Sequence, residues 1–180
     1  EKVNIEINSV TDNPIIFHKD GEAISGGNFH GQPMAMAMDF FGIAVAEIAN
    51  ISERRVARLV DHKLSDLPPF LVSDSGVNSG FMIPQYTAAA IVSENKVLAH
   101  PSCVDSIPTS AGQEDHVSMG GYSARKGMTI LNNTTRVIAI EMLNAAQGMD
   151  FRAPLKPGKG TSVAHKVFRE YVPFYEKDQY

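Results

Sequence analysis

The sequence predicts a mainly α-helical protein: a bundle of long helices preceded by a short β-hairpin region. Three long segments, at about residues 32–61, 79–100 and 117–149, are rich in apolar residues with helix-like spacing. Strand-like patterns are confined to positions 1–30. Of the 180 residues, 43% are hydrophobic, which suffices for a core and excludes a disordered chain.

Two strand signals lie in the N-terminal segment, 1–30. Residues 3–7 alternate apolar and polar side chains, which is typical of a strand with one buried face. The apolar runs Ile15-Ile16-Phe17 and Ala23-Ile24 lie on either side of Asp20-Gly21. An Asp-Gly pair between short apolar runs predicts a β-hairpin.

The first long helix is expected to begin near Pro33, because proline suits the first helical turn. Apolar residues cover every side of its first half, so we expect that half to be buried between other helices. The segment becomes amphipathic at 52–55 and should end near Asp61, before the prolines of Leu67-Pro68-Pro69-Phe70. Asp39 and Glu47 interrupt the apolar run, which we expect to be too short and too polar to cross a bilayer.

Two further long helices and a shorter one complete the bundle. The second should end at Pro101, and an irregular stretch, 101–116, leads to the third. A Pro/Gly/Lys linker follows, and Thr161-Ser162 can cap a last helix that begins at Val163. Helices of 20 to 30 residues are about 30 to 45 Å long. Because that exceeds the width of a compact globule of this size, we expect them to pack against other chains.

We therefore predict a single portion of a larger protein. It consists of a strand and loop segment at 1–30, long helices at 31–150, and a linker with the start of C-terminal helices at 151–180. The first residue is not methionine and the last segment is charged with no obvious stop, which also favours a piece of a longer chain.

Composition narrows the function. Sixteen Lys and Arg stand against 20 Asp and Glu, a net charge of −4, so the chain lacks the basic surface that nucleic acids or anionic membranes attract. The single cysteine, Cys103, cannot form an internal disulfide, and the sequence shows no positively charged, apolar, small-residue pattern of the kind that directs export. We expect a cytoplasmic protein.

Two loops carry chemically capable residues. The glycine-rich segment 25–31 could offer backbone N–H groups to an anion, or its glycines could serve only a sharp turn into the helix. It is not a nucleotide loop, because Gln32-Pro33 stands where a lysine and a hydroxyl residue are needed.

The second loop, 100–116, gathers His, Cys, Asp and Glu residues, but their spacing matches no zinc pattern. The structural alternative to a metal site places Glu114 and Asp115 at the N-terminus of the third helix, as caps. We expect His18, His62 and His165, which stand alone among polar neighbours, to be solvated.

Five motifs in order resemble the C-terminal half of the histidine ammonia-lyases, a branch of the aromatic amino acid lyase family. The resemblance covers about residues 3–174. The motifs are Ser9-Val10-Thr11-Asp12-Asn13-Pro14, Gly26-Gly27-Asn28-Phe29-His30-Gly31-Gln32, Leu67-Pro68-Pro69-Phe70-Leu71, Asn78-Ser79-Gly80-Phe81-Met82, and Asp105-Ser106-Ile107-Pro108-Thr109-Ser110 continuing through Gln113-Glu114-Asp115-His116-Val117-Ser118-Met119-Gly120.

The resemblance implies a homotetramer built around long helices and the elimination of ammonia from L-histidine to give urocanate. The family uses an electrophilic 4-methylidene-imidazol-5-one, which forms autocatalytically from an Ala-Ser-Gly tripeptide. This chain contains no such tripeptide; Ser110-Ala111-Gly112 has another order and stands where the family usually reads Ser-Ala-Asn. The electrophile, a tyrosine base and a carboxylate-binding arginine are thus expected in an N-terminal half, and the fragment alone should be inactive.

The resemblance assigns the chain part of the substrate pocket. Phe29 would stand near the electrophile and substrate, and Gln113 and Glu114 would face the substrate ring, with Glu114 as the catalytic residue and Phe29 and Gln113 as substrate-binding residues. Asn13 and His30 lie in matching motifs. A carboxylate can accept a hydrogen bond from an imidazole N–H but not from a phenyl ring, so Glu114 favours histidine.

Phenylalanine lyases carry Gln at the position of Glu114. The alternatives are a tyrosine or phenylalanine ammonia-lyase or an aminomutase of the same family, a non-catalytic helical assembly module, and a metal site in the loop from Cys103 to His116.

Overall fold

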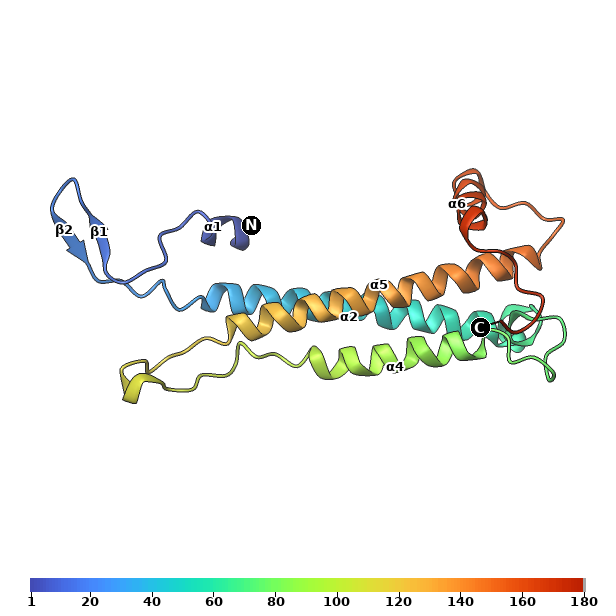
Figure 1. The fold of residues 1–180 in the computed structure, drawn as a ribbon, viewed down its shortest axis with the longest axis horizontal. Helices are drawn as coiled ribbons and strands as arrows, with labels where there is room; N and C mark the ends of the chain where they lie inside the picture. Colours follow the sequence, from blue (N-terminus) through green and yellow to red (C-terminus); the bar gives the residue numbers. More distant parts are fainter. Residues whose placement is uncertain (180) are drawn as a thin grey trace. The chain divides into compact units, whose positions relative to one another are not determined.

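The computed structural model describes residues 1–179, and it confirms a mainly helical fold with one short hairpin (Figure 1). Three helices are long: α2 (Gln32–Val60), α4 (Met82–Leu98) and α5 (Gly120–Asp150). The shorter elements, in chain order, are α1 (Lys2–Glu6), β1 (Ile15–Phe17), β2 (Glu22–Ile24), α3 (His62–Ser65), the 3-10 turns η1 (Pro69–Leu71) and η2 (Ser110–Gly112), and α6 (Lys159–Tyr171).

The chain forms two compact units, which are described separately. Unit 1 contains residues 1–45 and 96–131, and unit 2 contains residues 46–95 together with residues from 132 onward. Helices α2 and α5 each contribute their first part to unit 1 and their remainder to unit 2.

The expectation of a strand at residues 3–7 is wrong, because α1 covers Lys2–Glu6. The Asn8 amide donates to the Asn4 carbonyl at 2.7 Å, and the Ser9 hydroxyl donates to the Ile5 carbonyl at 2.7 Å. These local bonds offer the backbone a helical turn that competes with strand pairing. Alternation over so short a segment was too weak a signal to exclude that outcome.

The hairpin prediction is confirmed. β1 and β2 pair in antiparallel fashion, with Ile15 opposite Ile24 and Phe17 opposite Glu22. Gly21, in the connecting turn, has φ of +69°, a conformation that favours glycine. The Asp-Gly signal therefore placed this turn correctly.

The long helices begin and end close to their predicted bounds, and the clearest difference is at the shorter helix α6. Its N-cap is Gly158, and the Ser162 N–H already donates to the Gly158 carbonyl at 2.8 Å. The predicted cap residues Thr161 and Ser162 are therefore inside the helix, which begins at Lys159 rather than at Val163. A capping motif in sequence shows where a helix can start, but a helix continues upstream when nothing stops it.

α2 is long and apolar enough to meet the length and composition criteria for a membrane span. This corrects the expectation that the stretch is too short and too polar. The core helices of soluble proteins meet the same criteria. Several large side chains on α2 are exposed within this chain, including Met36, Phe40 and Ile48.

Close helix contact defines unit 1. Ala35 of α2 and Ile130 of α5 are fully or almost fully buried. A Cβ atom added at Gly42 would lie 3.1 Å from Cδ1 of Ile130, and one added at Gly127 would lie 3.5 Å from Met38. Small residues thus let α2 and α5 approach closely in this unit, and the two ribbons run side by side (Figure 1).

Unit 2 has two apolar clusters. One is built on Val60, Leu67, Leu71 and Phe81, and the other on Ala49, Ala88 and Val137. The buried Val137 lies on α5, so the second cluster joins residues of α2, α4 and α5.

The segment that follows α6 packs against the rest of this unit through polar contacts. The Gln147 side chain donates to the Tyr175 carbonyl at 2.8 Å and accepts from the Tyr175 N–H at 3.2 Å. The Asp178 carboxylate accepts the backbone N–H groups of Ser79 and Gly80, both at 2.8 Å. Residues 175–178 therefore hold the chain just before α4.

The expectation that His165 is solvated is wrong. His165 is half-buried, and its Nε2 lies 3.1 Å from Oδ1 of Asp150. Arg169 also pairs with Asp150, with Nη2 2.6 Å from Oδ2. His18 and His62 are exposed, as expected. His165 and Arg169 are four residues apart on α6, so both side chains reach the Asp150 carboxylate. The polar neighbours of His165 in the sequence gave no sign of this helical spacing.

Candidate functional site

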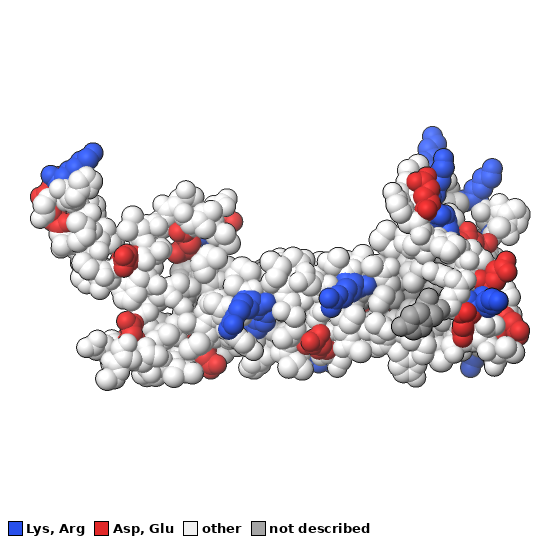
Figure 2. Space-filling view, viewed as in Figure 1, with Lys and Arg blue, Asp and Glu red and all other residues white. Residues whose placement is uncertain are grey.

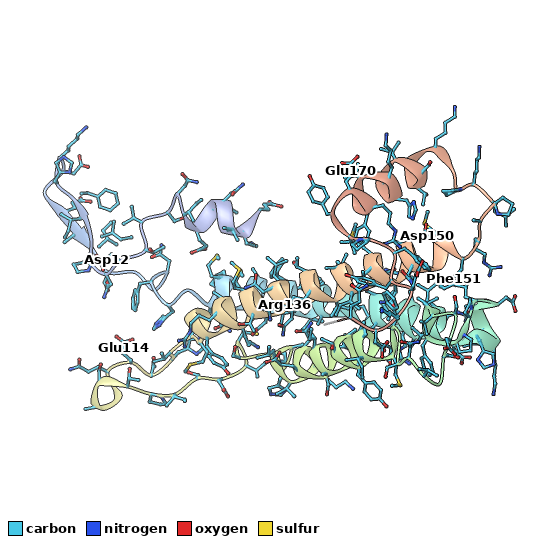
Figure 3. All side chains as sticks on the ribbon, turned by 45° about the vertical axis from the view of Figure 1, so that its right-hand side comes forward. Asp12, Glu114, Arg136, Asp150, Phe151 and Glu170 are labelled. Atoms are coloured by element: carbon cyan, nitrogen blue, oxygen red, sulfur yellow. The ribbon has the colours of Figure 1, made fainter. Side chains whose placement is uncertain are left out.

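All five predicted site residues lie in unit 1, on two loops. Asn13, Phe29 and His30 belong to the segments that flank the hairpin, whereas Gln113 and Glu114 belong to the loop between α4 and α5. Figure 3 labels Glu114 on this second loop, ahead of α5.

Asn13 holds the glycine-rich loop. Its Oδ1 accepts the Ser25 hydroxyl at 2.9 Å and the Gly26 N–H at 3.2 Å. The Asn28 side chain donates to the Val10 carbonyl at 2.7 Å. These bonds tie residues 25–28 to residues 10–13, so the first motif positions the second.

The glycine-rich loop turns sharply into α2. Gly31 has φ of +72°, and its carbonyl accepts the N–H groups of Met34 and Ala35, each at 3.0 Å. The prediction that glycines of this loop serve a sharp turn into the helix is confirmed at Gly31, because a positive φ favours a residue without a side chain. Phe29 and His30 are half-buried directly before this turn.

The two predicted loops meet at His30. Its ring centroid lies 4.4 Å from that of Phe29 and 5.7 Å from that of His116. The Ser118 hydroxyl donates to the His30 carbonyl. The structure therefore brings Phe29 and His30 to the loop that carries Gln113 and Glu114, although the two loops are distant in the sequence.

Gln113 and Glu114 follow a left-handed turn. Ser110, Ala111 and Gly112 have φ of 52°, 55° and 90°. Thr109 and Glu114 exchange two backbone hydrogen bonds, from Thr109 N–H at 3.0 Å and from Glu114 N–H at 3.3 Å. This closes residues 109–114 into a small backbone loop, with Gln113 exposed and Glu114 half-buried.

The capping interpretation of Glu114 and Asp115 is wrong. α5 begins at Gly120, so both carboxylates lie before its first turn, beyond the reach of a cap. Within residues 1–179, the Glu114 carboxylate forms no hydrogen bond or ion pair. Its oxygens are thus available to a donor from outside this chain.

A buried ion pair lies in the same unit, and sequence reasoning missed it. Asp39 of α2 and Lys126 of α5 approach to 2.7 Å, with side chains only 3% and 6% exposed. Oδ2 of Asp39 accepts the backbone N–H groups of Ser102 at 2.8 Å and Cys103 at 2.7 Å. The Asp39 carboxylate within the mainly apolar first half of α2 was the signal that could have revealed it, because an ionised group is rarely buried without partners.

These contacts shift two pKa values. Burial alone raises the pKa of Asp39, but hydrogen bonds from Lys126 and the Cys103 backbone outweigh it and lower the pKa to about 2. Burial raises the pKa of the Cys103 thiol, and the neighbouring Asp39 carboxylate raises it further. Asp39 is therefore ionised at neutral pH, and Cys103 remains a neutral thiol.

No group of three or more His, Cys, Asp or Glu side chains among residues 1–179 could hold a metal ion. A cavity of about 540 Å³ lies in unit 2 and is lined by Phe81, Pro84 and Tyr175. No predicted site residue lines it, so we base the candidate site on the two loops of unit 1.

The helical fold and the two loops of unit 1 are features that this chain shares with a known family. The family model described as aromatic amino acid lyase matches residues 1–170, and the chain belongs to this family.

Among relatives, the chain is similar to histidine ammonia-lyases. That of Caldanaerobacter subterraneus subsp. tengcongensis is 62% identical over 170 residues, which are 94% of this chain and 34% of the relative. That of Alkaliphilus oremlandii is 61% identical over 178 residues, 99% of this chain and 35% of the relative. The chain therefore spans about a third of the length of the curated relatives it matches.

Solved structures give the same result for the fold. The crystal structure of histidine ammonia-lyase from Trypanosoma cruzi is 51% identical with a TM-score of 0.95, over 99% of this chain and 36% of that one. Tyrosine aminomutase from Streptomyces globisporus is 40% identical with a TM-score of 0.93, over 99% of this chain and 34% of that one. The resemblance stated from the motifs is thus confirmed.

Proposed function

We propose that this chain is part of a histidine ammonia-lyase, which eliminates ammonia from L-histidine to give urocanate. The observation that carries the proposal is Glu114, whose unpaired carboxylate lies in the unit that also holds Phe29 and His30. The identity of 61% to 62% with histidine ammonia-lyases supports it.

Glu114 would bind the substrate imidazole. A carboxylate that accepts an imidazole N–H makes a charge-assisted hydrogen bond, which a phenyl or phenol ring cannot form at that point. With the wrong substrate, the buried charge would lose its partner, which penalises binding. Gln113 and Phe29 would contribute to the pocket wall, with Asn13 and His30 holding the glycine-rich loop that carries Phe29.

The electrophile would come from outside this chain. No Ala-Ser-Gly occurs in the 180 residues, and Ser110-Ala111-Gly112 forms an exposed left-handed turn, so these residues do not supply the precursor of 4-methylidene-imidazol-5-one. When present, that group would accept electrons from the substrate. The role we propose for this chain is to bind and orient the imidazole, and the fragment alone should give no urocanate.

Assembly with further chains is part of the proposal. Phe40 is 73% exposed and Met36 57% exposed on α2. Such apolar surface is typical of subunit contacts. In Figure 2 much of the surface along the long helices is uncharged. We propose a homotetramer in the cytoplasm, completed by an N-terminal half, with neither nucleic acid nor membrane as partner.

A chimera tests the proposed function. Residues 1–180 replace the matching third of the Alkaliphilus oremlandii enzyme, and urocanate formation from L-histidine is followed by absorbance. We expect a folded, active chimera, with Glu114→Gln as the matched variant that loses activity.

Three outcomes would contradict the proposal. Preference for L-tyrosine or L-phenylalanine would favour the other lyases or an aminomutase, which the similarity to tyrosine aminomutase keeps as the second candidate. A folded tetramer without activity would favour the assembly module. Full activity of Glu114→Gln would remove Glu114 from the site.

A further inference from the structure

The segment just before the candidate loop is held by an unusual concentration of polar contacts. Asp39 accepts the N–H groups of Ser102 and Cys103, and the Gln32 side chain donates to the Cys103 carbonyl at 2.8 Å. Lys126 donates to the His100 carbonyl and pairs with Asp39. Residues 100–103 are thus fixed by side chains of both α2 and α5.

The far end of the loop is also tied down. The Ser118 hydroxyl donates to the His30 carbonyl, and the Val117 N–H donates to the Ser106 hydroxyl at 3.1 Å. Between these two attachments, residues 107–115 are mostly exposed, and the backbone hydrogen bonds of this stretch are local ones within 109–114. Because the backbone hydrogen bonds of Glu114 join it only to Thr109 within this stretch, the position of Glu114 depends on where the loop as a whole is anchored.

A gain in folding stability does not explain why the buried pair that binds residues 100–103, Asp39 and Lys126, is charged. Burying two ions costs solvation energy, and apolar residues of similar size in place of a buried ion pair are often neutral or stabilising. An apolar pair could not accept two backbone N–H groups at one oxygen. The feature specific to the Asp39 carboxylate is its hold on the backbone at 102–103.

We propose that Asp39 and Lys126 are positioning residues: the buried pair anchors the loop whose far side carries Glu114, and it sets Glu114 for the substrate ring. The inference rests on the proposed role of Glu114. Neither Asp39 nor Lys126 contacts the substrate in this proposal; both act through the loop.

The test uses the active chimera and two substitutions that keep their charge. Asp39→Glu retains the ion pair but moves the accepting oxygens by one methylene. Glu141→Asp changes, by the same amount in the opposite sense, the ion pair of Glu141 with Arg55 in unit 2, and serves as the matched control. For each variant, kcat and KM for L-histidine and the thermal midpoint are measured, in the parent and in the Glu114→Gln background.

We expect Asp39→Glu to lower kcat/KM at least tenfold in the parent, with a thermal midpoint within a few degrees. In the Glu114→Gln background Asp39→Glu should lower kcat/KM less than threefold, because the Glu114 carboxylate that Asp39 positions is already absent. Glu141→Asp should leave kcat/KM within twofold in both backgrounds.

Equal losses from Asp39→Glu in both backgrounds would overturn the inference, since Asp39 would then act independently of Glu114. An unchanged kcat/KM would overturn it as well. Should Asp39→Glu fail to fold, the double variant Asp39→Leu with Lys126→Met replaces it, with the same expected pattern. Failure of the proposed function is distinguishable, because Glu114→Gln would then leave activity unchanged by itself.

Discussion

Helices α2 and α5 contribute an ion pair to each unit, and the two pairs differ in burial and in partners. In unit 1, Asp39 and Lys126 are 3% and 6% exposed, and both bind the backbone of residues 100–103. In unit 2, Arg55 is 53% exposed and Glu141 20% exposed. Glu141 also accepts the Ser52 hydroxyl at 2.6 Å, so this pair joins side chains of the two helices.

The comparison teaches what burial adds to an ion pair. In the exposed pair, water replaces a lost partner, so the pair contributes little. In the buried pair, loss of one partner leaves an uncompensated charge, and the loop bound to Asp39 loses its anchor. We therefore expect large consequences from losing the buried pair that holds backbone, and smaller ones from losing the partly exposed pair that links two side chains.

The largest expected effect comes from breaking the buried pair on one side. Lys126→Met leaves the Asp39 carboxylate unpaired, which should destabilise the chimera by about 3 to 5 kcal/mol. Urea unfolding followed by circular dichroism measures this. A loss no larger than that of an exposed pair would show that water reaches Asp39 and that the two pairs do not differ.

Glu114→Gln tests the function that the anchored loop serves. Losing the charge-assisted part of a hydrogen bond to imidazole should lower kcat/KM about tenfold to a hundredfold, about 1.5 to 3 kcal/mol. If Glu114 also moves a proton, the loss grows by a further ~10² to 10⁴. The thermal midpoint should stay unchanged. A less stable but fully active variant would show a purely structural Glu114.

Acid tests the buried pair through the pKa of Asp39. The pKa of Asp39 is about 2 in the fold against an ordinary value of 3.8, so its contribution is present above pH 4 and is lost as pH falls toward 2. That loss should amount to about 2 kcal/mol. Thermal midpoints measured from pH 5 to pH 2 should fall less steeply in Asp39→Leu with Lys126→Met. If the thermal midpoints of the parent and of the double variant fell equally steeply with pH, the lowered pKa of Asp39 would be contradicted.

The smallest effect is expected at the exposed pair. Arg55→Met removes the guanidinium that binds Glu141 and should cost about 0.2 to 1 kcal/mol. The cost should shrink in concentrated salt, because solvent ions screen exposed charges. Urea midpoints at two salt concentrations measure both, and a salt-independent loss as large as that of Lys126→Met would place this pair in the same class as the buried one.

Local signals in the sequence predicted much of the fold. The start of α2 at Gln32 and the hairpin around Asp20-Gly21 follow from proline, glycine and apolar spacing. The N-terminal alternation failed at Lys2–Glu6 because side-chain bonds to nearby carbonyls favour a helical turn there. Where a short segment can satisfy its hydrogen bonds either as a strand or as a helical turn, the spacing of apolar residues does not decide between the two.

The sequence predicted which residues form the candidate site, and that assignment stays a prediction, whereas the contacts that support the two loops were not predicted. The motifs identified Phe29 and Glu114, and the structure brings their loops together through His30 and His116. The anchor was missed because Asp39 and Lys126 lie far apart in the sequence, and no local pattern links them. An apolar helix that contains an acid invites a search for a basic partner elsewhere, but the sequence does not say which one.

The contact of Asp178 with the start of α4 has a consequence for synthesis. Its carboxylate receives the N–H groups of Ser79 and Gly80, and the Ser79 contact joins residues 99 positions apart. A ribosome that adds about 5 to 20 residues per second reaches Asp178 about 5 to 20 seconds after Ser79. During that interval α4 can form, but the N–H groups of Ser79 and Gly80 do not yet have the Asp178 carboxylate as their acceptor. This end of unit 2 is therefore completed only after Asp178 has been synthesised and has left the ribosome.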